Sequence, residues 1–207
     1  MVRPSAAIIG PLPTRRAKPA REREGEPMKH LQRIALAGFL LAASGLAADV
    51  AVASDSDICF RESGEVAIAA CNRVISSARS TRNELVDAYS NRGQEYYAKK
   101  DYDRAISDFD AAIKLDSRAI LAHGNRANAW YMKGQFDRAI NDYTRAISLD
   151  REYTAAYAGR GLAFEKKGDK GRAIADYKAA LSVKQKYQDG KWAHDNARQR
   201  LQVLEAK

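Results

Sequence analysis

The sequence predicts an all-α protein built from stacked pairs of helices. A seven-residue phrase occurs three times, and its copies begin at 34-residue steps, at Asp103, Asp137 and Gly171. Each copy starts a segment whose apolar residues recur every three or four positions, the spacing of one helical face. The 207-residue chain also has no proline after Pro27 that would interrupt a helix. A period of this length is typical of repeat proteins, whose neighbouring units bury a continuous core.

The first 53 residues differ in composition from the rest of the chain. Residues 1–27 hold all five prolines, and we expect them to be disordered or to precede a true start at Met28. Residues 28–53 are typical of a signal peptide, with a basic start, an apolar run over 34–46 and a small-x-small pattern ending at Ala53. We expect cleavage after Ala53, a periplasmic or secreted protein, and no stable membrane anchor afterwards. A membrane anchor is the alternative, although this apolar run is short for a span.

Much of the positive charge belongs to this leader. The chain carries 35 basic and 26 acidic residues, a formal net charge of +9. Residues 1–53 contain eight of the basic and four of the acidic residues, which leaves 27 against 22, or +5. So modest a charge is weak evidence for a nucleic-acid partner, and we expect none.

The two cysteines, Cys59 and Cys71, follow the signal peptide and are twelve positions apart. An even number of cysteines in an exported chain predicts a disulfide. Two separate buried thiols, or half of a metal site, are the alternatives. A metal site needs more ligands, and after the leader the chain offers only His123 and His194 as histidines, so we expect no metal and no cofactor.

Residues 54–83 predict a degenerate repeat with a shortened first helix. Residues 67–71 place Ala, Ile and Cys where residues 105–109 place Ala, Ile and Phe. The disulfide would tie the short helix to its partner. Residues 188–207 form an amphipathic segment after a break, and we expect a C-terminal capping helix that shields the last repeat.

Three full units follow the degenerate repeat, at 84–119, 120–153 and 154–187. Small residues occupy fixed columns where helix axes would approach closely, and large rings occupy others where they would fill the space between helices. The small columns include Gly93, Ala127 and Gly161 and also Ala105, Ala139 and Ala173; the aromatic columns are Tyr96, Trp130 and Phe164, and Phe109, Tyr143 and Tyr177.

This pattern resembles the tetratricopeptide-repeat (TPR) family, and with the leader and the cysteine pair it resembles small exported bacterial TPR proteins. The resemblance implies a right-handed superhelix of antiparallel helix pairs. Two departures stand out. The expected proline after each second helix is missing, and the inter-helix glycine, present at Gly134 and Gly168, is replaced by Lys100. A lysine would cost some stability if that position must be left-handed.

Charged residues recur in register as well. Arg92, Arg126 and Arg160 share one position, and Asp108, Asp142 and Asp176 share another on the following helix. We expect a ladder of Arg–Asp pairs between helices, with a basic stripe for phosphates or acidic peptides as the alternative. No catalytic motif is present, and His194 and Asp195 are neighbours that would point in different directions on a helix, so we expect neither catalysis nor a small-molecule substrate.

The resemblance implies that the first helices of the repeats line a concave groove for a peptide or helix. Carried over by position, the groove would contain Asp87, Ser90, Gln94, Tyr97, Leu121, Asn125, Asn128, Tyr131, Met132, Leu162, Glu165 and Lys166. Plain solvated surface is the alternative. Some family members hold a C-terminal carboxylate at positions that here carry Ser90, Gln94, Asn125, Ala155 and Gly159, and only Asn125 fits.

The sequence thus predicts a non-catalytic protein–protein interaction module, an exported adaptor or assembly factor whose partner is unidentified. One alternative is a chaperone-like holder of export substrates, which would bind many sequences weakly. The other is a basic nucleic-acid binder, which would show steep salt dependence.

Overall fold

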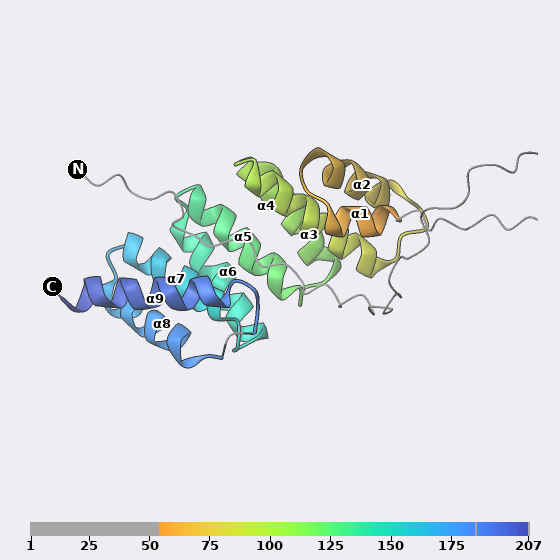
Figure 1. Ribbon diagram of the computed structural model, residues 1–207. Helices are drawn as coiled ribbons and strands as arrows, with labels where there is room; N and C mark the ends of the chain where they lie inside the picture. The colour runs from red at the N-terminus through yellow and green to blue at the C-terminus, as the bar shows by residue number, and fades with distance from the viewer. Residues whose placement is uncertain (1–53, 185, 207) are drawn as a thin grey trace, which may run out of the picture. The chain divides into compact units, whose positions relative to one another are not determined.

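The computed structural model describes residues 54–184 and 186–206. The expected extension at 1–27 and the expected signal peptide at 28–53 lie outside these residues. The described part consists of helices, with no strand in it (Figure 1). They are α1 (Asp55–Arg61), α2 (Gly64–Ser76), α3 (Arg82–Ala98), α4 (Tyr102–Leu115), α5 (Ile120–Met132), α6 (Phe136–Leu149), α7 (Thr154–Lys166), α8 (Lys170–Ser182) and α9 (Gly190–Glu205). None of the described helices is long and apolar enough to cross a membrane.

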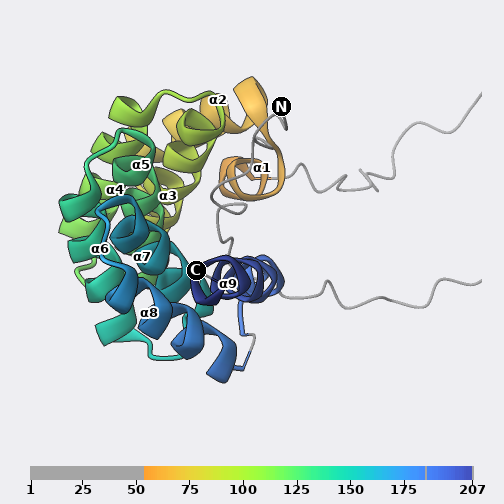
Figure 2. The ribbon, with the colours of Figure 1, turned by 90° about the vertical axis from the view of Figure 1, so that its left-hand side faces the viewer.

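The expected solenoid of three helix pairs is confirmed. Helix α3 packs on α4, α5 on α6 and α7 on α8, and each pair also contacts the next. Helices α3, α5 and α7 form an inner layer, whereas α4, α6 and α8 form an outer layer (Figure 2). Helices α1 and α9 lie on the inner side of this arrangement.

The recurring small residues make room for the recurring rings. Phe109, Tyr143 and Tyr177 are almost completely buried. A Cβ atom at Gly93 would lie 2.7 Å from the Phe109 ring, and one at Gly161 would lie 2.7 Å from the Tyr177 ring. The distance between the two helices of a repeat is therefore limited by the contact between a glycine on one helix and an aromatic ring on the other, a form of ridge-into-groove packing.

The turns inside the helix pairs share one backbone conformation. Gly134 and Gly168 have φ values of 73° and 79°, and Lys100 has a φ of 62° at the matching position. Lys100 is thus in the left-handed conformation, which costs free energy for any residue that has a Cβ atom.

The Arg–Asp ladder is confirmed, and each rung has a further contact. The guanidinium groups of Arg92, Arg126 and Arg160 each donate two hydrogen bonds to the aspartate of the outer helix in the same repeat, at 2.6–2.8 Å. The remaining Nη1 of each arginine reaches the outer helix of the preceding repeat, where its acceptors are Asn72, Asp110 and Thr144 respectively. These arginines join neighbouring repeats and do not form an open basic stripe.

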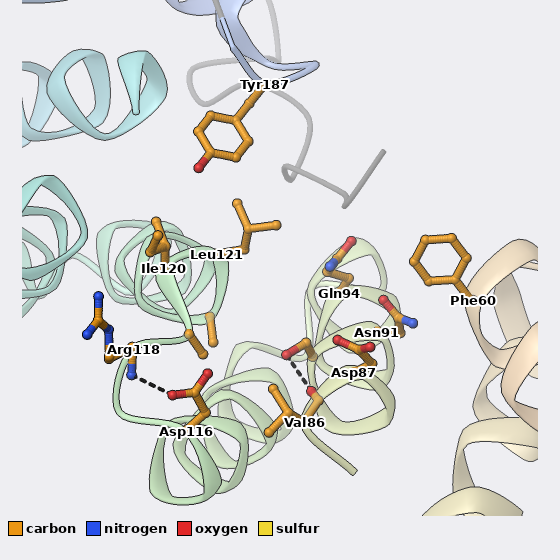
Figure 3. A pocket seen from close by; sticks show the side chains of 13 residues that line it. Phe60, Val86, Asp87, Asn91, Gln94, Asp116, Arg118, Ile120, Leu121 and Tyr187 are labelled. Carbon is orange, nitrogen blue, oxygen red and sulfur yellow. Dashed lines mark hydrogen bonds between the residues drawn. The ribbon is translucent and has the colours of Figure 1, made fainter. Parts of the chain in front are cut away.

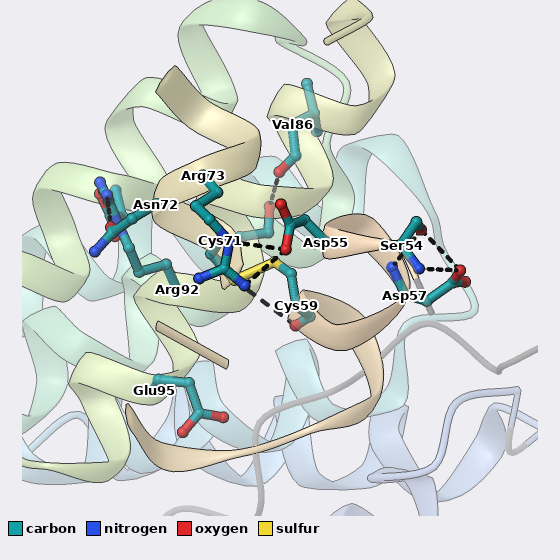
Figure 4. The surroundings of a disulfide bond; sticks show 12 residues. Ser54, Asp55, Asp57, Cys59, Cys71, Asn72, Arg73, Val86, Arg92 and Glu95 are labelled. Atoms are coloured by element: carbon teal, nitrogen blue, oxygen red, sulfur yellow. Dashed lines mark hydrogen bonds and ion pairs between the residues drawn. A yellow bond between two sulfur atoms is a disulfide. The ribbon is translucent and has the colours of Figure 1, made fainter. Parts of the chain in front are cut away.

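The N-terminal unit follows the same plan in shortened form. Cys59 of α1 and Cys71 of α2 form the expected disulfide, with an S–S distance of 2.11 Å (Figure 4). Asn72 meets Arg92 as Asp110 meets Arg126, so α2 takes the place of an outer helix. Helix α1 contacts both α2 and α3, and an Arg73–Asp55 ion pair also joins it to α2. The disulfide and this exposed ion pair both tie α1 to α2, in addition to the apolar cluster that Ile58 and Val74 share.

Helix α9 caps the third repeat and also reaches its inner helix. Ala193, Ala197 and Leu201 are buried against a cluster that contains Tyr131 and Leu162. Helix α9 contacts both α7 and α8. The predicted apolar face of α9 thus covers part of the inner layer as well as the end of the stack.

Candidate functional site

A pocket opens between α3 and α5 on the inner layer (Figure 3). It has a volume of about 250 Å³. Its lining comes from the two inner helices, the turn before α5, α1 and the segment before α9: Phe60, Val86, Asp87, Ser90, Asn91, Gln94, Asp116, Arg118, Ala119, Ile120, Leu121, Ala122 and Tyr187. We call this site the α3–α5 pocket.

Two aromatic residues from outside the helix pairs α3–α8 line this pocket. Phe60 follows Cys59 on α1, so the disulfide anchors the residue next to it. Tyr187 is held by a hydrogen bond from its hydroxyl to Asp150 Oδ2 at 2.6 Å and by an edge contact with the Tyr153 ring at 5.0 Å. Figure 3 shows Phe60 and Tyr187 at separate borders of the pocket, with Leu121 and Gln94 between them.

The polar lining is ordered by local hydrogen bonds. Ser90 Oγ donates to the carbonyl of Val86 at 2.7 Å, which occupies its hydrogen. Asp116 Oδ1 accepts from the backbone N–H of Arg118 at 2.9 Å. The Arg118 side chain extends away from Asp87 in Figure 3, whereas Asp87 lies on the Phe60 side of the pocket.

The structure divides the twelve expected groove residues into groups. Asp87, Ser90, Gln94 and Leu121 line the α3–α5 pocket. Asn125, Asn128, Tyr131 and Leu162 are buried. The other four lie near the ends of the inner helices: Tyr97 and Glu165 are partly buried, and Met132 and Lys166 are exposed.

Asn128, Glu165, Tyr131 and Leu162 contact other parts of the described chain, whereas the amide of Asn125 is buried without a hydrogen-bond partner there. Asn128 Oδ1 accepts a hydrogen bond from the Tyr143 hydroxyl. Glu165 accepts hydrogen bonds from Arg200 of α9 and, at 3.0 Å, from the Tyr177 hydroxyl. Tyr131 and Leu162 share the cluster that α9 covers. At these positions the inner face is occupied by the chain itself, so the accessible site is concentrated at α3 and α5.

The expected groove did not include the other nine lining residues, namely Phe60, Val86, Asn91, Asp116, Arg118, Ala119, Ile120, Ala122 and Tyr187. Phe60 and Tyr187 lie outside the inner helices of the three full repeats, so positional carry-over could not find them. The sequence signal for each was an aromatic residue close to a boundary between segments: Phe60 follows Cys59, and Tyr187 precedes Gly190.

The residue before α9 has unusual electrostatics. Asp189 is 2% exposed, and its carboxylate oxygens accept no hydrogen bond within the described chain. Burial raises the pKa of Asp189 to about 7. Its charge also contributes to the raised pKa values of Tyr143, Tyr153 and Tyr187, although burial is the largest cause for each of them.

The histidines have structural contacts. His123 Nε2 lies 3.2 Å from the carbonyl of Ser117, and His194 Nε2 lies 3.0 Å from that of Val183. Across residues 54–184 and 186–206, no three His, Cys, Asp or Glu side chains are grouped so that they could hold a metal ion.

Comparisons with known proteins agree with this geometry. Models described as tetratricopeptide repeat match residues 86–118 and 154–187, and one described as TPR repeat matches residues 127–168. No curated protein matches the chain.

Solved structures match the helical part. The second TPR domain of human RPAP3, in complex with the HSP70 peptide SGPTIEEVD, is 26% identical with a TM-score of 0.54, over 61% of this chain and 100% of that one. The Arabidopsis OM64 TPR domain is 28% identical with a TM-score of 0.51, over 58% and 99%. The first TPR of Spaghetti (RPAP3), bound to the HSP90 peptide SRMEEVD, is 24% identical with a TM-score of 0.53, over 59% and 92%, and shows the fold alone.

Proposed function

Because the chain belongs to the tetratricopeptide-repeat family, whose fold is a protein-interaction scaffold, we propose that it is an exported adaptor or assembly factor. Its partner segment, a peptide or a helix, binds in the α3–α5 pocket and along the inner faces of these two helices. The third repeat serves mainly as a scaffold, because α9 covers part of its inner face.

The observation that carries this proposal is the α3–α5 pocket itself. Its volume of about 250 Å³ is below the range of roughly 300–1,000 Å³ that small-molecule pockets occupy. A hollow of this size suits one or two side chains of a partner chain. Leu121 and Tyr187 give it apolar contact area, and Gln94 gives it an amide that can both donate and accept. Buried apolar anchors surrounded by polar groups are the usual centre of a protein interface.

The positions that would clamp a C-terminal carboxylate do not support that binding mode here. Ser90 donates to a backbone carbonyl, and Asn125 is buried. At Gly159 the Tyr143 ring fills the space beside the backbone, since a Cβ atom there would lie 2.5 Å from Tyr143 Cζ. None of the five clamp positions carries a cation. We therefore propose a partner other than an acidic chaperone tail.

Two features support export as part of the proposal. The leader over 28–53 has the composition of a signal peptide. The Cys59–Cys71 disulfide belongs to the kind of bond that persists in oxidising compartments. Intact-mass measurement on protein recovered separately from the cell envelope and from the cytoplasm tests this part. An envelope chain beginning at Ser54 supports export, and a cytoplasmic chain that retains residues 28–53 contradicts it.

Site-specific photo-crosslinking in cells tests the binding site. A photoreactive residue at Gln94 lies in the α3–α5 pocket, and one at Arg145 lies exposed on the outer helix α6 as the matched control. We expect discrete adducts from position 94 and few from position 145. Equal adducts from both positions would contradict the proposal. A broad smear from position 94 would instead favour a chaperone-like holder.

A further inference from the structure

We propose that the turns inside the three helix pairs form a second binding surface, which docks the protein on the phosphate headgroups of an anionic lipid bilayer. We call residues 98–104, 132–138 and 166–172 the turn edge, since the inner helices end and the outer helices begin there. This surface is separate from the proposed partner site. No residue that lines the α3–α5 pocket belongs to the turn edge.

Ion pairs join the turns into one row. A lysine that follows each inner helix meets a carboxylate near the start of the preceding outer helix; the pairs are Lys99 with Glu65, Lys133 with Asp103, and Lys167 with Asp137. In two of the turns an arginine also pairs with the aspartate that caps its own helix, Arg104 with Asp101 and Arg172 with Asp169. Every carboxylate of the turn edge therefore already has a cationic partner.

An excess of positive charge remains along this row. The turn edge contains nine lysines and arginines against four aspartates, or +5, which equals the net charge of residues 54–207. The rest of that part of the chain is therefore electrically balanced. Four cationic side chains of the turn edge are exposed and have no ion pair or hydrogen bond in the described part of the chain, namely Lys100, Arg138, Lys166 and Lys170.

Apolar side chains lie among these cations. Two hollows, with volumes of about 370 and 310 Å³, are lined entirely by residues of the turn edge, and each contains one aromatic ring, Tyr102 in the first and Phe136 in the second. Met132, at the end of α5, is 42% exposed. Peripheral binding to an anionic bilayer combines electrostatic attraction with burial of such apolar groups at the headgroup level. The turn edge offers both.

This arrangement suits a bilayer better than a nucleic acid or an acidic protein segment. One face of each ring beside the turns is covered by an arginine 4.4–4.6 Å from the ring centre, Arg104 on Tyr96, Arg138 on Trp130 and Arg172 on Phe164. These rings are therefore poor platforms for stacked bases. Each hollow contains one unpaired cation, Lys100 or Arg138, so neither gathers several free donors around a single carboxylate. Cations spread along a row instead meet the many headgroups of an extended anionic surface.

Co-sedimentation of the purified protein with lipid vesicles tests this inference. One set of vesicles is phosphatidylcholine, and the other is an equal mixture of phosphatidylcholine and phosphatidylglycerol. Because an apolar segment binds both sets, the ratio of the two partition coefficients measures the preference for anionic lipid. Each cation near an anionic surface contributes about 5-fold, so the four unpaired cations should give a ratio on the order of 100 at low salt. The ratio should fall as salt is raised, because exposed charges are screened.

Variants assign this preference to the turn edge. Arg138→Gln with Lys170→Gln removes two of its unpaired cations and should lower the ratio by about 10- to 30-fold at low salt. The matched control, Lys114→Gln with Arg145→Gln, removes one lysine and one arginine that are exposed and unpaired on the later halves of α4 and α6, away from the turn edge. It should leave the ratio unchanged. Circular dichroism checks that both double variants are folded.

The possible outcomes are distinct. A ratio near one for the parent protein would overturn the inference, and so would a ratio that the Arg138/Lys170 variant leaves unchanged. Equal losses in the two double variants would also overturn it, because the effect would then come from net charge. Displacement of the protein from anionic vesicles by an excess of poly-glutamate or of a single-stranded oligonucleotide at matched charge concentration would assign the surface to that competitor instead. Neither double variant alters the α3–α5 pocket, so crosslinking from Gln94 stays an independent test of the proposed function.

Discussion

Arg200 of α9 and Glu165 of α7 form an ion pair across the inner face of the third repeat, with Nε and Oε2 3.0 Å apart. Glu165 also accepts a hydrogen bond from Tyr177, so the contact joins α9 to both helices of that repeat. This relationship explains why the accessible part of the groove lies at α3 and α5. Helix α9 behaves as a fixed part of the inner face.

Packing of α9 should contribute more to stability than its ion pair. Leu201→Ala removes a side chain that is 8% exposed and should cost about 2–4 kcal/mol of unfolding free energy. Val203→Ala on the same helix changes a side chain that is 41% exposed and should cost about 0.5 kcal/mol or less. Denaturant unfolding measures both. Equal effects would show that α9 is not held by this apolar face.

Replacing the left-handed lysine should stabilise the protein. Lys100→Gly relieves a non-glycine residue at φ 62° and should raise the unfolding free energy by about 1 kcal/mol. Lys99→Gly changes the neighbour, whose φ is −78°, and should lower it instead, because glycine adds freedom to the unfolded chain. Chemical denaturation of the two variants beside the parent protein decides the sign. Destabilisation by Lys100→Gly would contradict this account of the turn.

The pKa of Asp189 predicts a stability that falls with pH. The folded state raises this pKa from 3.8 to about 7, so between these values the native protein holds a proton that the unfolded chain has released. Stability from this group is therefore fully present below about pH 4 and is lost as pH rises towards 7, by on the order of 4 kcal/mol in total. Asp189→Asn should remove that slope between pH 4 and 7. Asp195→Asn, which alters an exposed carboxylate on α9, should retain it.

The disulfide should affect both stability and binding. Its removal by Cys59→Ser with Cys71→Ser should cost roughly 2–3 kcal/mol, the value for a loop of about a dozen residues. Because Cys59 anchors α1, the double variant should also weaken, through Phe60, the binding of a peptide selected for affinity from a random phage-displayed library. Phe60→Ala in the oxidised protein is the control and should weaken binding with a smaller loss of stability. Unchanged affinity in both variants would remove α1 from the site.

Repetition determines how much of this structure the sequence could predict. Positions that recur in three units, such as the Arg126–Asp142 rung, the ring of Phe109 and the left-handed turn at Lys100, were all evident from the alignment of the copies. Each repeat packs against equivalent neighbours, so residues at the same repeat position make the same contacts in the structure.

The groove was less predictable because it depends on segments that occur once. Helix α9 has no counterpart in the repeats, and its placement buries Tyr131 and Leu162, which positional carry-over assigned to open surface. Phe60 and Tyr187 enter the pocket from the two ends of the stack. Only tertiary contacts bring these residues together, and the 34-residue repeat pattern contains no information about such contacts.

The central claim is tested most directly by amide hydrogen exchange on the protein alone and on the protein saturated with a peptide that was selected for affinity from a random phage-displayed library. A partner bound in the α3–α5 pocket should slow exchange in α3 (Arg82–Ala98) and α5 (Ile120–Met132) and leave the outer helices α4, α6 and α8 unchanged. Protection confined to the outer helices, or to the exposed side of α9, would contradict the account.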